Sequence, residues 1–137
     1  MGLDLAQEQG LAAREDEGRV VHLWDFVTGE LAYEGDVPVT VTVAGRLSAR
    51  HRKAADAWDR GQMRRRNANA DAATDRQNAI LAACILGWQG LTLKGAAFEF
   101  TPKNVEVLVK TMPRLRDDLW VEVHDDAAFF AGNSTPS

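Results

Sequence analysis

The stretch Val37–Val43 (VPVTVTV) is the clearest structural signal in the sequence and decides the fold class. Valine and threonine alternate from Val39 onward, and both are β-branched residues that suit a pleated, half-buried strand. Pro38 stands near the start of the stretch, where the edge of a sheet tolerates a residue without an amide proton. The pattern therefore predicts a β-strand.

The residues before this strand predict its pairing partners. In Val20–Phe26, alternate residues (Val20, His22, Trp24 and Phe26) share one face, and the turn signal Thr28-Gly29 separates them from Leu31–Tyr33. This spacing is typical of a hairpin. We therefore expect a three-stranded antiparallel sheet over residues 20–44, with His22 filling a strand position and Trp24 in the core.

A helix with an unusual surface is predicted after the sheet. Gly45 breaks the strand, and Ser48 is a suitable N-cap for a helix that runs to about Arg66. Its large apolar residues are few and give it too narrow a stripe for a core element. The sequence therefore predicts a helix that is exposed or binds a partner.

The second half of the chain predicts further helices around a short hairpin. Thr74–Gln77 has the form of a capping box before the apolar segment Ile80–Leu86, which predicts a buried helix ending at Gly87. A short hairpin or a tight apolar loop is expected within Leu91–Phe100. Thr101-Pro102 and Pro113 then each open a helix, because proline is favoured at the first helical position. The last helix is expected to continue past Ala127, and Trp88 and Trp120 are expected in the core.

These elements indicate an α+β fold, with a small N-terminal antiparallel sheet of about three strands followed by three or four helices. A length of 137 residues is enough for one compact domain. We expect a flexible tail or short helix at residues 1–18 and a single domain over 19–131. A mobile linker is expected at 67–73, and a loose tail at 132–137.

Composition narrows the class of protein. The chain is 45% hydrophobic and 26% charged, which is ordinary for a globular protein, and no apolar run is long enough to span a membrane. Its single cysteine, Cys84, cannot form an internal disulfide, so a reducing compartment is expected.

No residue pattern predicts an active site. Cys84 lies within an apolar segment, where a thiol is unreactive, and His124 with Asp125 and Asp126 is expected to form a solvated face rather than a metal site. Phosphate-binding, dinucleotide-binding and hydrolase motifs are absent from the sequence. We therefore predict a non-catalytic protein without a cofactor or a metal.

Charge is distributed unevenly along the chain. Residues 46–66 hold eight basic and two acidic side chains, a net charge of +6, in a chain whose total is −4. This helix is the predicted partner-binding element, with an aromatic anchor and steering charges. The predicted contact residues are Arg50, Arg52, Lys53, Trp58, Arg64, Arg65 and Arg66. A solvated basic helix and a nucleic-acid interface are the alternatives; an acidic total charge and the lack of a DNA-binding motif weigh against the second.

Two stretches of the sequence carry a family resemblance. The first runs from the strand into a basic helix, VPVTVTVAGRLSARHRKA, with Gly45, Ser48 and the basic residues after it. The second is LAACILGWQGLTLKGAAFEFTPKN, which contains Gly87-Trp88, a glycine loop at Gly95, and Phe100 before Thr101-Pro102-x-Asn104; a phenylalanine, Phe129 or Phe130, stands near the C-terminus. Over residues 20–130 this order resembles the small tail assembly chaperones of long-tailed bacteriophages. The segment Asp117–Asp126 departs from that pattern by being more acidic.

The resemblance implies a non-catalytic assembly factor made in the host bacterial cytoplasm and absent from the mature virion. Such a protein binds the tape measure protein and recruits major tail (tube) protein subunits. A second copy of this chain, giving a homo-oligomer, is a further candidate partner of the basic helix. Two other classes remain open. One is a virion structural protein, such as a minor tail or head–tail connector component, and the other is a nucleic-acid-binding protein that acts through residues 46–66.

Overall fold

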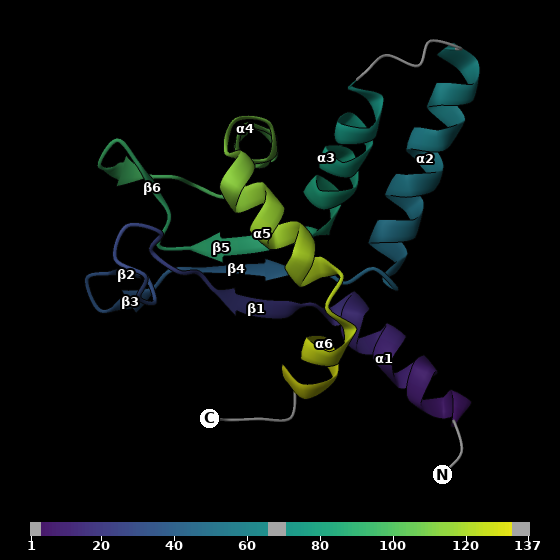
Figure 1. Ribbon diagram of the computed structural model, residues 1–137, viewed down its shortest axis with the longest axis horizontal. Helices are drawn as coiled ribbons and strands as arrows, with labels where there is room; N and C mark the ends of the chain where they lie inside the picture. The colour runs from purple at the N-terminus through teal and green to yellow at the C-terminus, as the bar shows by residue number, and fades with distance from the viewer. Residues whose placement is uncertain (1–3, 66–70, 133–137) are drawn as a thin grey trace.

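The computed structural model describes residues 4–65 and 71–132 and has an α+β architecture (Figure 1). Within these residues there are six helices, one three-stranded sheet and two small two-stranded ribbons. The α+β class is therefore confirmed. The expected count of three or four helices is too low, because a helix forms at Leu5–Glu17, where a flexible tail or short helix was expected, and another forms at Asp126–Gly132, where the end of a longer helix was expected.

The main sheet joins strands that are far apart in the sequence. Its order is β1 (Arg19–His22), β4 (Thr40–Val43) and β5 (Ile85–Gln89), with both neighbours antiparallel to β4. The prediction that all three strands of this sheet come from residues 20–44 is wrong, because the third strand, β5, lies beyond two helices. The register places Val41 opposite both Val21 and Trp88, and Val41 is fully buried.

The predicted strand Val37–Val43 is divided between two sheets. Val37–Pro38 (β3) pairs with Tyr33–Glu34 (β2) in a separate ribbon, while Thr40–Val43 is the central strand β4. Val39 lies between them, where its amide donates to the Ala32 carbonyl and its carbonyl accepts from the Leu23 amide, both at 2.9 Å. The hairpin predicted for Val20–Phe26 is reduced to a single bridge between Trp24 and Leu31.

Two antiparallel helices, α2 (Ala49–Arg65) and α3 (Ala72–Cys84), connect β4 to β5 (Figure 1). The predicted cap of α2 is confirmed, since the Ser48 Oγ accepts from the His51 amide at 3.2 Å and donates to the Gly45 carbonyl at 2.6 Å. The capping box predicted at Thr74 is wrong, because α3 has already begun at Ala72. The predicted linker at 67–73 falls mainly outside the described residues.

The segment Ile80–Leu86 was predicted as one helix, but α3 ends at Cys84 and β5 begins at the next residue. After β5, the ribbon of β6 (Thr92–Leu93) and β7 (Ala96–Ala97) confirms the predicted hairpin. Its turn places Lys94 and Gly95 at φ values of 52° and 82°, as a two-residue hairpin turn requires.

Three helices end the described chain: α4 (Pro102–Thr111), α5 (Pro113–Val123) and α6 (Asp126–Gly132). The Thr101 hydroxyl accepts from the Asn104 amide at 3.1 Å, which confirms the predicted cap of α4. The single last helix that the sequence predicted is instead interrupted at His124. Asp125 then caps α6, since its carboxylate accepts from the Ala128 amide at 3.1 Å.

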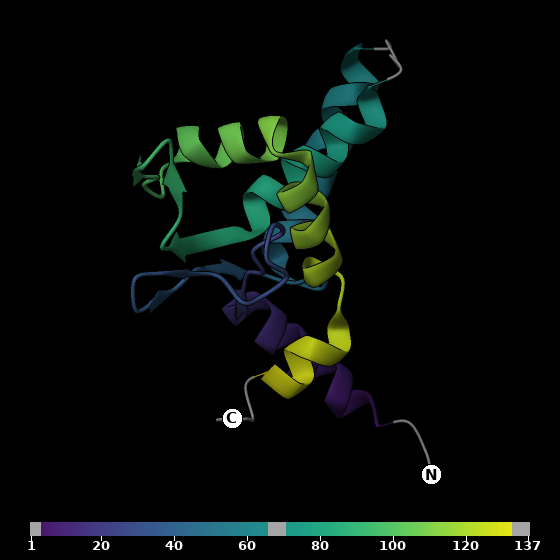
Figure 2. The same cartoon turned by 60° about the vertical axis from the view of Figure 1, so that its left-hand side comes forward.

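Near the N-terminus, the expected tail or short helix takes the form of a helix, α1 (Leu5–Glu17), which packs beside α6 (Figure 2). Glu15 of α1 is fully buried. Its Oε1 atom accepts from the Leu47 amide at 3.1 Å, and its carbonyl accepts from the Gly45 amide at 2.9 Å. These bonds join α1 to the connection between β4 and α2.

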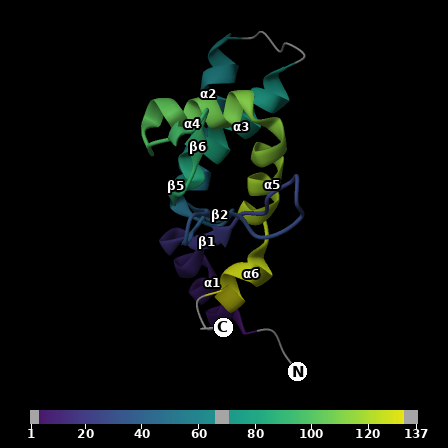
Figure 3. The same cartoon turned by 90° about the vertical axis from the view of Figure 1, so that its left-hand side faces the viewer.

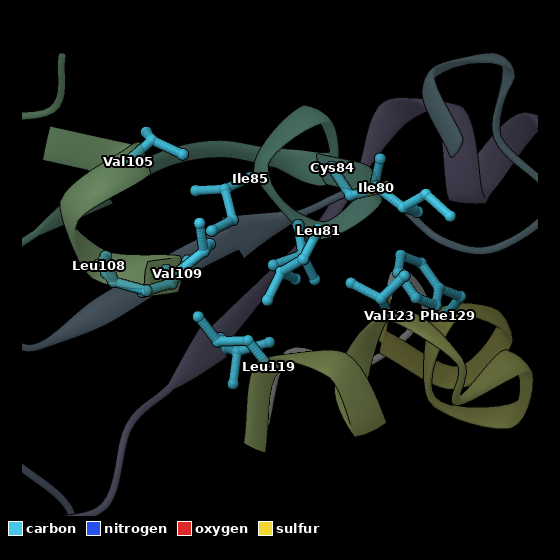
Figure 4. Close-up of a cluster of buried hydrophobic side chains, with 14 of the residues drawn as sticks. Ile80, Leu81, Cys84, Ile85, Val105, Leu108, Val109, Leu119, Val123 and Phe129 are labelled. Carbon is cyan, nitrogen blue, oxygen red and sulfur yellow. The ribbon is translucent and has the colours of Figure 1, made fainter. Parts of the chain in front are cut away.

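One core unites the sheet with α3, α4, α5 and α6 (Figure 4). Its apolar side chains come from one face of β4 and β5 and from the facing sides of the helices. The labelled members in Figure 4 are Ile80, Leu81, Cys84, Ile85, Val105, Leu108, Val109, Leu119, Val123 and Phe129. Because this core fills the space between sheet and helices, the remaining surface features are candidates for function.

Candidate protein-binding surfaces

The basic helix α2 presents its predicted contact residues on the surface. Arg50, Arg52 and Lys53 are exposed, and so is Arg60 two turns further along. The side chains of Arg64 and Arg65 and the whole of Arg66 lie outside the described residues. The part of the predicted site that the structure describes is therefore a row of cations on one helix.

Trp58, the predicted aromatic anchor, is half-buried. It lines a shallow hollow of about 100 Å³ with Ala57, Gly61 and Gln62, all from α2 itself. A hollow of this size leaves part of the indole accessible, but it offers little room for a partner's side chain.

The narrow apolar stripe of α2, which predicted an exposed or partner-binding helix, is nevertheless enough to pack the helix against α3. Ala54 and Ala55 pack against the core on the side that faces α3, and Asp59 forms an ion pair with Arg76 of α3 at 3.0 Å. Small alanines allow the two helices to approach closely, so α2 does not need a wide apolar stripe to be held. Only its opposite side is free to bind.

A second surface, which the sequence did not predict, lies between β1 and β2. Trp24, Phe26 and Val27 are 66%, 69% and 80% exposed, so the prediction of Trp24 as a core residue is wrong. The alternation that predicted a strand continues past His22, but the chain leaves the sheet there. Large apolar residues then occupy a surface loop, residues 23–32, which we call the aromatic loop.

The aromatic loop is held in shape by its own hydrogen bonds. The Asp25 amide donates to the Glu30 carbonyl at 2.7 Å, and the Gly29 amide donates to the Asp25 carbonyl at 2.8 Å. The Asp25 carboxylate also accepts from the Val27 amide at 2.8 Å. An internally bonded loop presents its aromatic side chains at low cost in conformational entropy.

The aromatic loop and α5 enclose an apolar groove of about 720 Å³, which we call the α5 groove. Residues 23–27 line one side, and residues 112–115 with Asp118 line the other. Figure 3 shows the loop beside α5. The Arg114 guanidinium lies over the Phe26 ring, 5.0 Å from its centroid, and so closes one part of the groove with a cation–π contact.

A smaller hollow of about 380 Å³ continues this groove along α5. The α5 groove and this hollow share four lining residues, Leu23, Trp24, Arg114 and Asp118. The hollow also reaches Val121 and Glu122, which do not line the α5 groove. Val121 is 65% exposed, so the apolar surface extends over the last turn of α5.

Of the side chains best suited to chemistry, Cys84 is buried in the core, and His22 is half-buried and bonded to the backbone. Cys84 is fully buried, and burial raises the pKa of its thiol to about 12, which keeps it protonated at neutral pH. His22 bonds to the Ala32 carbonyl at 2.8 Å. Among the described residues, no three metal-ligating side chains are grouped closely enough to hold an ion.

His124 was expected on a solvated face but belongs to a half-buried histidine pair. Its Nε2 lies 3.2 Å from the His51 Nε2, and its Nδ1 lies 2.8 Å from the Trp120 carbonyl. Because Nδ1 faces a carbonyl oxygen, it is the donor in that bond, and the contact between the two Nε2 atoms needs one ring to donate and the other to accept. Burial and the neighbouring His124 lower the pKa of His51.

Glu15 is the other unusual ionisable group. Burial raises the pKa of its carboxyl from 4.5 to about 7, the neighbouring Asp126 adds to this effect, and the bond from Leu47 opposes it. Asp126 is itself paired with Arg46. The cluster joins α1 to α6 and has no cavity beside it among those that the structure shows, so it indicates a structural role.

Comparisons of the chain with profiles of protein families, with curated proteins and with solved structures find no match. Between residues 4 and 65 and between 71 and 132, no helix has the length and apolarity needed to cross a membrane.

Proposed function

We propose that this chain is a non-catalytic phage tail assembly chaperone that binds the tape measure protein and recruits tail tube subunits in the host cytoplasm. The observation that carries the proposal is the presence of two separate, chemically different surfaces. One is the basic side of α2, and the other is the apolar aromatic loop with its groove. An adaptor that brings two proteins together needs two such surfaces.

The arrangement of these surfaces supports the proposal. In Figure 1, α2 lies on the right and the ribbon β2–β3, which follows the aromatic loop, lies on the left. Arg50, Arg52 and Lys53 are exposed on the first, and Trp24, Phe26 and Val27 on the second. Large apolar residues exposed together on a bonded loop are typical of a protein-binding site.

The test is co-expression of the chain with the tape measure and tube proteins of the same genome, followed by co-purification. One variant reverses Arg50, Arg52 and Lys53 to glutamate, and another replaces Trp24 and Phe26 with serine. Each should stay folded and lose one of the two partners. Reversal of Lys94 and Lys103, which are exposed elsewhere, is a charge-reversal control away from α2, and this variant should bind both partners.

Loss of neither partner in either variant would overturn the two-surface proposal, and failure of the unchanged chain to bind either protein would overturn the function itself. Mass spectrometry of purified particles separates this proposal from a virion structural protein. A structural protein would be present at a fixed copy number, whereas a chaperone would be absent.

A nucleic-acid-binding function is the second candidate, because α2 places four exposed cations on one helix. Binding through phosphate contacts would weaken steeply as the salt concentration rises. In a plot of the logarithm of the binding constant against the logarithm of the salt concentration, the slope would fall by about one for each phosphate neutralised. A salt titration with duplex and single-stranded DNA tests it, and the triple reversal on α2 should abolish any binding.

A further inference from the structure

We propose that the α5 groove is the docking site for an amphipathic helix of a partner protein, about three turns long, which places a basic side chain against Asp118. This inference rests on the proposed function only in requiring that the chain acts by binding another protein. It assigns the chemistry of the partner to a specific surface.

The apolar lining indicates an apolar face on the occupant. Trp24, Phe26 and Val27 project from the aromatic loop, while Met112 and Leu115 lie on the opposite wall. Because the loop is fixed by its own hydrogen bonds, the aromatic side chains are already arranged for contact. Apolar anchors in a pre-formed groove supply most of the free energy of such interfaces.

The length of the groove fits about three helical turns. Its two hollows together follow the α5 side from Met112 to Glu122. At 1.5 Å per residue this distance is about 15 Å, which is the length of about ten helical residues. A helix lying along α5 would therefore place side chains at i, i+3 or i+4, and i+7 in the two hollows.

The hydrogen bonding of the aromatic loop favours a helix over an added strand. A strand would need free backbone donors, yet the amides of Asp25, Val27, Thr28 and Gly29 all donate within the loop. The amides of Glu30 and Ala32 also donate within it. Recognition at the aromatic loop therefore depends on side chains, which suits a helix whose own backbone is already satisfied.

The charge of the occupant follows from Asp118. This carboxylate is exposed, lines both hollows and makes no ion pair with any described residue. The other charged side chains along the groove are engaged: the Asp25 carboxylate accepts from the Val27 amide, Glu122 pairs with Arg19, and Arg114 lies over Phe26. A lysine or arginine in the middle of the occupant would find Asp118 free, so the acidic character of α5 serves recognition.

The probe is a synthetic, fluorescently labelled peptide of about 15 residues, which is long enough for a helix to form on binding, with leucines at helical spacing and flanking lysines. Its binding to the full chain is measured by anisotropy. Phe26→Ser should weaken binding by at least about tenfold, as expected for an aromatic anchor. Asp118→Asn should weaken it by about two- to fivefold at low salt and less at high salt.

Three controls make the result specific. Leu5→Ser removes an equally exposed apolar residue from α1 and should leave the affinity unchanged. A peptide of the same composition with leucines at alternate positions presents a strand pattern, and a peptide with glutamate for lysine reverses the charge. Both should bind more weakly than the lysine helix.

Equal binding of the strand-pattern peptide would overturn the helical occupant, and equal binding of the glutamate peptide would overturn the role of Asp118. If no peptide binds, or if Phe26→Ser binds like the unchanged chain, the groove is not the docking site. If the chain then still co-purifies with the tape measure protein, the proposed function stands without this groove. If it binds neither the peptides nor the tape measure protein, the proposed function is overturned as well.

Discussion

Replacing Gly45 with alanine should strongly destabilise the protein, although the change adds only one methyl group. An ideal Cβ at Gly45 would lie 2.5 Å from Cγ and 2.6 Å from Cδ of Glu15. Glu15 is fully buried and its Oε1 accepts from the Leu47 amide, so it cannot move aside without losing that bond. The clash must therefore distort the joint between α1 and the β4–α2 connection.

The magnitude combines two costs. Overpacking of this kind costs about 1 to 3 kcal/mol, and leaving a buried amide without its acceptor costs about 1 to 3 kcal/mol more. We expect a loss of about 4 kcal/mol in the free energy of unfolding, which is a large part of the roughly 5 to 15 kcal/mol that domains usually have. Urea denaturation followed by tryptophan fluorescence measures it.

A double-mutant cycle identifies the cause. In a Glu15→Ala background the obstructing side chain is gone, so Gly45→Ala should cost less than about 1 kcal/mol and the coupling energy should be large. Gly10→Ala is the matched control, because nothing lies within 4 Å of its Cβ and alanine favours an exposed helix. An equal cost of Gly45→Ala in both backgrounds would refute the steric explanation.

Three further outcomes are expected. The pKa of Glu15 is about 7 in the folded protein against an ordinary 4.5, so between these pH values the folded state binds more protons than the unfolded state. The free energy of unfolding should therefore fall by up to about 3 kcal/mol as the pH rises through this range. Glu15→Gln should flatten that fall in urea midpoints measured from pH 4 to 8, and an unchanged slope would contradict the assignment. Trp88→Ala should lower the free energy of unfolding by about 3 kcal/mol, because the indole stacks on the Phe98 ring at 5.4 Å between centroids and its Nε1 donates to the Phe98 carbonyl at 2.6 Å. A variant that is equally stable in urea would show that Trp88 is not a core residue. Thr101→Ala should lower the thermal midpoint by removing about 1 kcal/mol of capping, and Thr101→Ser should restore most of it.

Local features of the fold could be predicted from the sequence because short-range chemistry determines them. Ser48 and Thr101 cap helices through bonds to amides three residues away, and the Lys94-Gly95 turn closes its hairpin within two residues. The strand at Thr40–Val43 was also predicted, since β-branched residues alternate there.

Long-range pairing could not be predicted in this way. Ile80–Leu86 is continuously apolar, and an apolar run of this length fits either a buried helix or a buried strand. The choice depends on β4, which supplies partners for Ile85 and Gly87 from far away in the chain. The sequence contains no glycine or proline at the boundary between α3 and β5 that would mark the change.

The candidate site was predicted only in part, for a related reason. The cations of α2 could be recognised because charge clusters are visible in sequence. The aromatic loop could not, because alternation from Val20 to Phe26 predicts burial unless the end of the strand is known. The docking of α2 on α3 was missed because Ala54 and Ala55 gave no strong apolar signal.

The position of β5 has a consequence for how the chain folds. The central strand β4 can pair with β5 only after α2 and α3 have been synthesised, because both helices lie between the two strands in the sequence. Formation of the α2–α3 pair shortens the loop that this strand pairing must close, and a shorter loop lowers its entropic cost. During synthesis on the ribosome, β1 and β4 therefore form an incomplete sheet until β5 has emerged. Mutations that weaken the contact between α2 and α3 should slow folding more than they speed unfolding.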